Sequence, residues 1–354
     1  MQRWGQESFH EGHAIQRTDE PVLRARAAYV VDVTAGVELW ARDADEPMPP
    51  ASTIKMLTAL TARRLLSLEE RVVIRADDLV DPTVYANAGF RPGDRVRVHD
   101  LLAALLVASA GDAARALARV GGARLAPEAA DPRRVFVSAM NAEARQLGLR
   151  GTRVLTPDGR DTPTQVTTAR DLAMVAARLL SDPVLAKLVA TPTVEIGIEG
   201  AAARKGRLWN TNRLLGEPGV LGVKTGTSTA AGECLVTAVR RGNNVVILVV
   251  LGSVDRYAET RTLLDWLDRH YRWVTVDGRT FPELAALWRL GVVPAIVPTL
   301  LLTAAQAERL EMEIEITDRA GARRIVGTVR LRTGTVGLVV VPLVRSDPRR
   351  LAPE

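Results

Sequence analysis

The sequence predicts an α+β fold in which a larger layered domain is followed by a small β-rich domain. Three observations support this prediction. A chain of 354 residues is long enough for two domains. Strand-like segments lie at both ends of its first 274 residues and helix-like segments lie between them, without alternating β and α units. After Val274 apolar and charged residues alternate, as in a sheet with one face in water.

The N-terminal part of the larger domain is predicted to form a β-hairpin followed by a helix. Two apolar segments, 28–33 and 37–41, flank a short turn that contains glycine. A proline-rich stretch, 47–50, then interrupts the chain. Residues 52–66 have the apolar spacing of a helix, and Ser52 stands at its expected N-terminus.

The middle of the chain is predicted to be helical, and strands are predicted to follow it. Helical patterns cover 101–120, 133–147 and 168–180, and the first of them is interrupted near 109–112. A turn is expected at 156–159, where the sequence reads Thr-Pro-Asp-Gly. The strands expected next are 194–198, 207–210, 222–225, 234–240 and 245–251, and a closing helix is expected over 260–273.

The last part of the chain has the period of two that is typical of strands. Residues 311–316 alternate between glutamate and apolar side chains, and residues 329–332 alternate between apolar side chains and arginine. We expect 276–346 to form a separate β domain in which these glutamates and arginines pair across strands, with little gain in stability. The other expected parts are a polar tail over 1–21, the larger domain over 22–274 and a second tail over 347–354.

The composition argues against several classes of protein. With 47% hydrophobic and 25% charged residues, the chain is not a disordered or fibrous one. Its longest apolar stretch, Val245–Leu251, has the length of a strand, so no membrane-spanning helix is expected. The single Cys234 and four scattered histidines predict neither disulfides nor a metal site. Arginine is dispersed and aromatic residues make up only 4%, which argues against nucleic-acid binding.

Arginine greatly outnumbers lysine among the basic residues. The net charge is +6, and the only lysines among 47 basic residues are Lys55, Lys187, Lys205 and Lys224. A positive balance suits an anionic wall or membrane surface, although a general preference for arginine explains it more simply. Lysine is the basic residue whose pKa shifts readily on burial, so each lysine is a candidate for chemistry. The first twenty residues are polar, so no signal peptide is expected in this chain.

Ser52 and Lys55 form the first candidate site. Positions i and i+3 share one face of a helix, with Cβ atoms about 5–6 Å apart, so the hydroxyl and the amine can meet. A serine hydroxyl becomes a good nucleophile when an adjacent base takes its proton, and a neutral lysine can be that base. The lysine pKa must then fall by roughly three units from about 10.4. Burial, a second cation and a helix N-terminus all act in that direction.

Two further motifs supply the other groups that such a site needs. Lys224, Thr225, Gly226 and Thr227 lie in and just after an expected strand. The glycine allows close approach of a substrate backbone, the lysine is the second cation, and the hydroxyls can bind a carboxylate. Ser109 lies at the interruption in the helical pattern, where it can pass a proton from the first lysine to a leaving group. Each motif alone is weak evidence, and their joint occurrence favours a catalytic site.

In this order the motifs resemble the S-x-x-K, S-x-N and K-T-G signature of penicillin-binding proteins and serine β-lactamases. The surrounding residues are similar to the low-molecular-weight D-alanyl-D-alanine carboxypeptidases. The similar segments are 49–56, 109–114, 147–149, 156–159, 168–172, 210–215, 219–235 and 327–344, so the resemblance covers about residues 25–345. The sequence departs from the signature at Gly111, where the second motif of the family ends in asparagine.

The resemblance implies a serine β-lactamase/DD-peptidase-like domain, an antiparallel sheet flanked by helices with a helical subdomain, followed by a small C-terminal β domain. It implies removal of the terminal D-alanine from peptidoglycan stem peptides ending in D-Ala-D-Ala, outside the cytoplasmic membrane, with no cofactor and with β-lactams as covalent inhibitors. The implied residues are Ser52 as nucleophile, Lys55 as general base, Ser109 as proton relay, Lys224, Thr225, Gly226 and Thr227 for substrate binding, and the N–H groups of Ser52 and Thr227 as oxyanion hole.

Two alternatives remain open from the sequence. A class A-type β-lactamase needs a deacylating glutamate between the second and third motifs, and residues 156–164 contain Asp158 and Asp161 but no glutamate. A catalytically impaired wall-binding protein is suggested by Gly111, because an asparagine there offers the substrate a donor and an acceptor. Loss of one such bond slows an enzyme by about one or two decades, so we expect a slow peptidase. A preference for endopeptidase substrates also remains open.

Overall fold

The computed structural model of the chain describes residues 19–317 and 324–345, which form two compact units. The first unit runs through Arg240 and includes residues 245–263, whereas the second consists of residues 241–244 and the chain from Leu264 onward. The expected tail over 1–21 lies almost wholly outside the described residues, and that over 347–354 lies wholly outside them. Across 19–317 and 324–345 no helix is long and apolar enough to cross a membrane.

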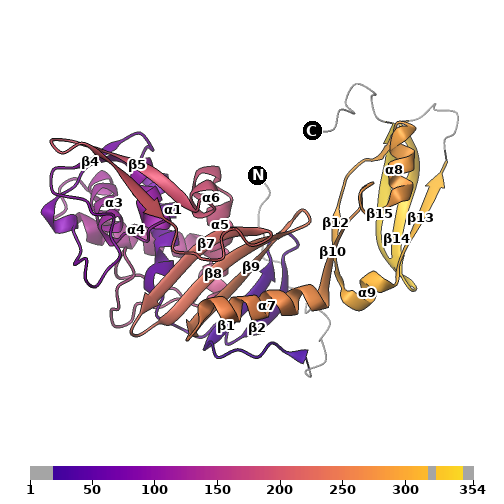
Figure 1. The fold of residues 1–354 in the computed structure, drawn as a ribbon, viewed down its shortest axis with the longest axis horizontal. Helices are drawn as coiled ribbons and strands as arrows, with labels where there is room; N and C mark the ends of the chain where they lie inside the picture. The colour runs from indigo at the N-terminus through magenta and orange to yellow at the C-terminus, as the bar shows by residue number, and fades with distance from the viewer. Residues whose placement is uncertain (1–18, 318–323, 346–354) are drawn as a thin grey trace. The chain divides into compact units, whose positions relative to one another are not determined.

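A five-stranded sheet with the strand order β2-β1-β9-β8-β7 organises the first unit (Figure 1). Its strands are β1 (Ala27–Asp32), β2 (Val37–Arg42), β7 (Val220–Ser228), β8 (Gly232–Arg241) and β9 (Asn244–Ser253). β1 pairs with β9, with Ala28 opposite Val250, so the strands predicted at both ends of this part of the chain share one sheet. β7 is an edge strand, and its outer edge is therefore available for other contacts.

Helices cover this sheet and form a largely helical region beside it (Figure 1). They are η2 (Ala51–Ile54), α1 (Lys55–Leu65), η3 (Ala76–Asp78), α2 (Val98–Leu106), α3 (Gly111–Leu125), α4 (Pro132–Gln146), α5 (Ala169–Leu180), α6 (Pro183–Val189) and α7 (Arg256–His270). A second sheet has the order β3 (Arg71–Val73), β4 (Arg95–Arg97), β5 (Thr193–Glu199) and β6 (Arg204–Trp209). The first eight residues of α1 are buried, so this helix lies within the core.

Two helical predictions meet different outcomes. The pattern over 101–120 is interrupted as expected, because α2 ends at Leu106 and α3 begins at Gly111. The closing helix begins and ends earlier than the predicted 260–273, since α7 ends at His270 and the next residues form strand β10 (Tyr271–Thr275). That strand pairs with β12 (Thr299–Thr303), and the second unit accordingly includes residues before the predicted boundary at 274.

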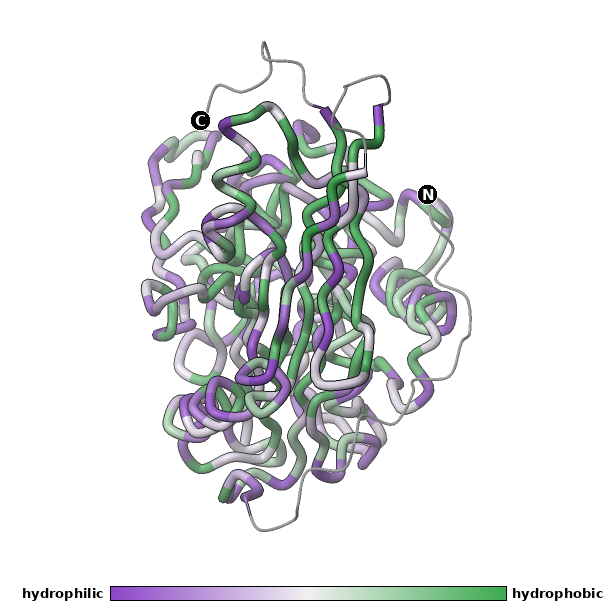
Figure 2. Tube along the Cα trace, turned by 90° about the vertical axis from the view of Figure 1, so that its right-hand side faces the viewer, coloured by the Kyte–Doolittle hydropathy of each residue, from purple (hydrophilic) through white to green (hydrophobic). Residues whose placement is uncertain are grey.

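The second unit contains the C-terminal β region. Its four-stranded sheet has the order β11 (Val292–Pro294), β15 (Val336–Arg345), β14 (Ile325–Thr333) and β13 (Leu310–Ile316), and the unit also contains α8 (Pro282–Arg289) and α9 (Ala304–Glu308), which the sequence pattern did not predict. Glutamates alternate with hydrophobic residues along β13, and arginines alternate with hydrophobic residues in the second half of β14; Figure 2 colours the chain by hydropathy. Arg332 pairs with Glu311 at 2.8 Å and Arg330 with Glu315 at 3.1 Å, so the predicted ion pairs are present on a half-exposed face.

Candidate active site

Ser52 lies in η2, one turn before α1, and its hydroxyl contacts the amine of Lys55. Lys55 Nζ donates a hydrogen bond to Ser52 Oγ over 2.9 Å, which is the contact expected from their spacing. The preceding Ala51 has a φ of 45°, in the left-handed region. A Cβ on Gly159 would lie 2.0 Å from the carbonyl oxygen of Ala51, so only glycine lets that loop pack against the turn that carries Ser52.

Lys55 is 3% exposed and joins the first motif to the second. Its Nζ also donates to the carbonyl oxygen of Ser109 at 2.6 Å, and it lies 3.4 Å from Ser109 Oγ. Burial lowers the pKa of Lys55 to about 8. The negative charges of Asp158 and Asp112 act against this change, and the positive charge of Arg160 acts with it. A lysine with this pKa is partly neutral near physiological pH and can therefore accept a proton.

Ser109 lies between α2 and α3 and brings the two buried lysines together. Its φ of 59° is a left-handed conformation, which turns the chain where the helical pattern breaks. Lys224 Nζ donates to Ser109 Oγ over 2.8 Å. The four side chains of the three motifs thus form one continuous chain of contacts, from Ser52 through Lys55 and Ser109 to Lys224.

Lys224, on β7, is completely buried, and its pKa is lowered like that of Lys55. Burial lowers the pKa of Lys224 well below its usual value, and the charges of Lys55 and Arg256 lower it further. Its amine donates to Ser109 and to the carbonyl oxygen of Thr225, at 3.0 Å. The sequence predicted that Lys224 would supply a cation to Lys55 and to a substrate carboxylate. In the structure burial disfavours the charged form of Lys224, and its amine donates a hydrogen bond to Ser109.

The other residues of the third motif lie along the edge strand β7. Thr225 shares a hydrogen bond with Thr211 at 2.6 Å between hydroxyl oxygens. A Cβ on Gly226 would lie 3.1–3.2 Å from atoms of η2 and the residue before it, so this glycine allows the strand to pack closely against the turn that carries Ser52. Thr227 is exposed. An edge strand with an exposed hydroxyl is suited to pair with an extended peptide.

Arg256 is a candidate site residue that the sequence analysis missed. This first residue of α7 is 7% exposed, and its guanidinium donates to the Thr227 hydroxyl. It also donates to the carbonyl oxygen of Gly226 at 2.7 Å and pairs with Glu233 at 3.1 Å. Because 43 of the residues are arginine, nothing local in the sequence distinguished this one. The guanidinium that contacts the third motif therefore comes from helix α7, and Arg256 lies thirty residues after Gly226 in the sequence.

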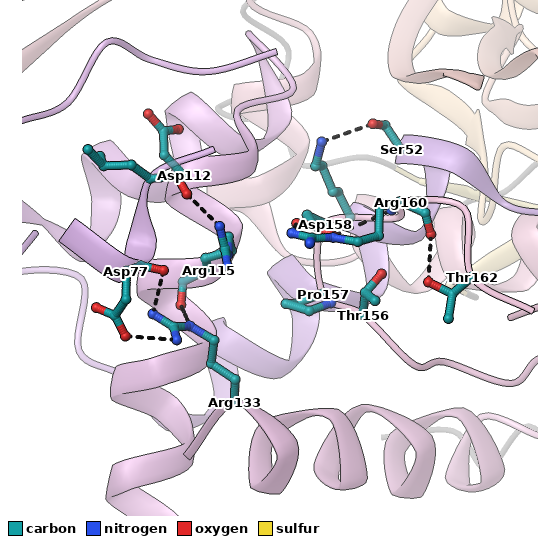
Figure 3. A network of polar contacts seen from close by, with 12 residues as sticks. Ser52, Asp77, Asp112, Arg115, Arg133, Thr156, Pro157, Asp158, Arg160 and Thr162 are labelled. Carbon is teal, nitrogen blue, oxygen red and sulfur yellow. Dashed lines mark hydrogen bonds and ion pairs between the residues drawn. The ribbon is translucent and has the colours of Figure 1, made fainter. Parts of the chain in front are cut away.

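An ion pair between Asp158 in the turn at 156–159 and Arg160 just after it borders the site (Figure 3). Asp158 and Arg160 are joined at 2.5 Å, and Asp158 is buried. Burial acts to raise the pKa of Asp158, but the hydrogen bond and charge of Arg160, together with the charge of Lys55, hold that pKa below its usual value. The Thr58 hydroxyl of α1 donates to the Pro157 carbonyl oxygen at 2.7 Å and fixes this turn one helical turn beyond Lys55.

Gly111 stands where the family signature has asparagine. Its N–H donates to the carbonyl oxygen of Ala86 at 2.8 Å, and a Cβ would lie 3.2 Å from Val80. The neighbouring Asp112 accepts hydrogen bonds from the N–H groups of Ala88 and Ala113, and burial raises its pKa. Its oxygens are therefore engaged with backbone donors. Asp112 is poorly placed to replace the missing amide, and an asparagine at 111 needs room beside Val80.

Comparisons with known proteins agree with this geometry. The family model for D-alanyl-D-alanine carboxypeptidase matches residues 14–255. The D-alanyl-D-alanine carboxypeptidase DacB2 of Mycobacterium tuberculosis is 31% identical over 273 residues, which are 74% of this chain and 88% of that protein. The Streptomyces K15 DD-transpeptidase, whose crystal structure is known, is 29% identical in sequence, with a TM-score of 0.64. The match covers 70% of this chain and 98% of the Streptomyces chain.

A fourth similarity concerns the fold of both units. The crystal structure of penicillin-binding protein 6B from Escherichia coli is 24% identical in sequence, with a TM-score of 0.69. The match covers 96% of this chain and 100% of the Escherichia coli chain. The fold is thus that of a penicillin-binding protein with a C-terminal β region. The chain belongs to the D-alanyl-D-alanine carboxypeptidase family, which confirms the predicted fold class and family. Its class of activity is that of a serine-type D-alanyl-D-alanine carboxypeptidase.

Proposed function

We propose that the protein removes the terminal D-alanine from peptidoglycan stem peptides through an acyl-enzyme on Ser52. The observation that supports this most directly is the chain of contacts from Ser52 through Lys55 and Ser109 to Lys224. It joins a nucleophile, a base with a lowered pKa and a hydroxyl relay, which acyl transfer requires. β-Lactams are then expected as covalent inhibitors, and we propose that the protein works outside the cytoplasmic membrane.

In the proposed first step, neutral Lys55 takes the proton of Ser52 as its Oγ bonds to the carbonyl carbon between the two D-alanines. The tetrahedral intermediate collapses when the C–N bond breaks, and the proton passes from Lys55 through Ser109 to the leaving amine. Water then attacks the acyl-enzyme and returns the proton to Ser52. With a pKa of about 8, about a tenth of Lys55 is neutral at pH 7. The pKa therefore limits the rate at neutral pH without preventing the reaction.

The edge strand β7 is the proposed binding site for the end of the substrate. An extended peptide can add to this strand beside Gly226, which places its terminal carboxylate near the hydroxyls of Thr225 and Thr227. Arg256 contacts Thr227 and supplies the positive charge there. The backbone N–H groups of Ser52 and Thr227 are proposed as the oxyanion hole, in which each donor contributes about 3–4 kcal/mol to the transition state.

The test is mass spectrometry of the whole chain after reaction with penicillin. One acyl mass on the peptide that contains Ser52, absent from Ser52→Ala and retained in the exposed control Ser138→Ala, is the expected result. An adduct that survives in Ser52→Ala contradicts the proposal. Rapid release of the acyl group from penicillin, with no release of D-alanine from a D-Ala-D-Ala peptide, indicates the alternative β-lactamase activity.

A further inference from the structure

A cavity of about 810 Å³ lies in the first unit next to the turn at 156–159. Its walls come from α3, α4 and residues 153–160. The charged residues that line it are Arg115, Arg133, Arg134, Arg145, Arg153 and Arg160 on the positive side, and Asp131 and Asp158 on the negative side. The volume is in the range of small-ligand sites, and the lining is strongly cationic.

Two of these arginines are neutralised by the protein itself (Figure 3). Arg133 pairs with Asp77 at 3.0 Å and with Asp78 at 2.7 Å. Arg160 pairs with Asp158. These two cations therefore have partners in the folded chain and require no ligand.

The other four arginines lack a carboxylate partner within the part of the chain that the structure describes. Arg115 donates to the carbonyl oxygen of Leu79, and burial lowers its pKa together with the charges of Arg160 and Arg133. The side chains of the exposed Arg134, Arg145 and Arg153 have no hydrogen bond or ion pair there. The second carboxylate of the cavity, Asp131, accepts from the backbone N–H of residue 134 and caps α4. Six arginines line the cavity against two aspartates, so its lining carries a net positive charge that attracts an anion.

The cavity and the active site share the turn at 156–159. Asp158 and Arg160 line the cavity, and the charges of both act on Lys55. Pro157 also lines it, and its carbonyl oxygen accepts the Thr58 hydroxyl of α1. The strand β7, which is proposed to hold the terminal carboxylate of the substrate, contributes no residue to the lining. A substrate carboxylate bound in the cavity is therefore a different group from the terminal carboxylate and belongs to a residue farther from the C-terminal end of the substrate.

We propose that the arginine-lined cavity binds a carboxylate of an acidic peptide substrate, upstream of the two D-alanines. This inference rests on the proposed function, because it assigns to the same reaction a preference for acidic stem peptides. Arg134, Arg145 and Arg153 are the residues that recognise the carboxylate, and Arg115 adds positive potential from the inner wall. None of them touches the reacting atoms, so their effect is on substrate binding.

The experiment compares pairs of D-Ala-D-Ala peptides that differ only in glutamate or glutamine, placed two or three residues before the first D-alanine. The wild-type chain is expected to show a lower KM for the glutamate peptide at an equal kcat. Arg145→Gln and Arg153→Gln should each reduce that preference about two- to fivefold, the range of a partly exposed ion pair, and the triple variant that adds Arg134→Gln should abolish it. Arg150→Gln, an exposed arginine outside the lining, is the matched control and should retain the preference.

Inorganic phosphate distinguishes a substrate carboxylate from a free oxyanion. It is expected to compete with the glutamate peptide and to leave hydrolysis of the glutamine peptide unchanged. Equal KM values for the two peptides overturn the proposal, whether or not phosphate binds. A preference that survives in the triple variant, or that is lost equally in Arg150→Gln, also overturns it. Acylation of Ser52 by penicillin is measured in every variant. If it fails in the wild type the proposed function is wrong, whereas normal acylation without discrimination contradicts the cavity inference alone.

Discussion

Asp158→Asn is expected to accelerate acylation of Ser52 at neutral pH. The negative charge of Asp158 raises the pKa of Lys55 and so keeps more of the base protonated, whereas burial and Arg160 lower that pKa. The amide removes the charge while keeping the size of the side chain. It also leaves Arg160 without its carboxylate, and the unpaired guanidinium acts in the same direction. The neutral, active form of Lys55 then persists to lower pH.

The size of the effect follows from the starting pKa of about 8, at which about a tenth of Lys55 is neutral at pH 7. Loss of one nearby opposite charge lowers a lysine pKa by about one unit, to about 7. About half of Lys55 is then neutral at pH 7, so acylation should be about fivefold faster. Above pH 9 Lys55 is mostly neutral in both proteins, and their rates should converge.

The assay is stopped-flow acylation with a chromogenic β-lactam across pH 6 to 9.5. Arg160→Gln should move the midpoint upward, because it removes a cation and leaves the carboxylate of Asp158 unpaired. Glu46→Gln removes an exposed carboxylate that is not among the charges acting on Lys55, and its profile should match the wild type. An unchanged midpoint in Asp158→Asn, or equal shifts in Asp158→Asn and Glu46→Gln, would refute the assignment of Lys55 as the base.

The remaining predictions concern the base, the second motif and the second unit. Lys55→Arg should lose acylation with penicillin, since guanidinium stays protonated; acylation at the normal rate with an unchanged melting temperature would show a purely electrostatic role. The double variant Gly111→Asn with Val80→Ala, in which the smaller side chain provides room, should have a kcat/KM on a D-Ala-D-Ala peptide about tenfold higher than that of Val80→Ala alone. A fall in kcat/KM in both Gly111→Asn and the double variant indicates a rebuilt pocket. A chain ending at His270 should still acylate, because every motif residue precedes it, and a folded but inert product would show that residues after His270 are required.

The sequence was sufficient to predict the elements that depend on local pattern. Period-two alternation predicted strands β13 and β14, and the break in the apolar pattern at 109–112 predicted the gap between α2 and α3. The contact between Ser52 and Lys55 followed from helical spacing, which two positions in one segment are enough to determine. The end of α7 at His270 was missed, because pairing of β10 with β12 is a contact between distant segments.

The tertiary structure decided which basic side chains lie at the site and how burial changes the pKa values of the two lysines. Burial depends on packing from many segments, so only the fold shows that Lys224 is enclosed and contacts Ser109. Arg256 reaches Thr227 from a separate helix, and no spacing along the chain encodes that approach. The arginine-lined cavity likewise combines α3, α4 and residues 153–160. The sequence by itself was enough to predict a nucleophile and a base and to identify the family, whereas the positions of charges from distant segments required the folded chain.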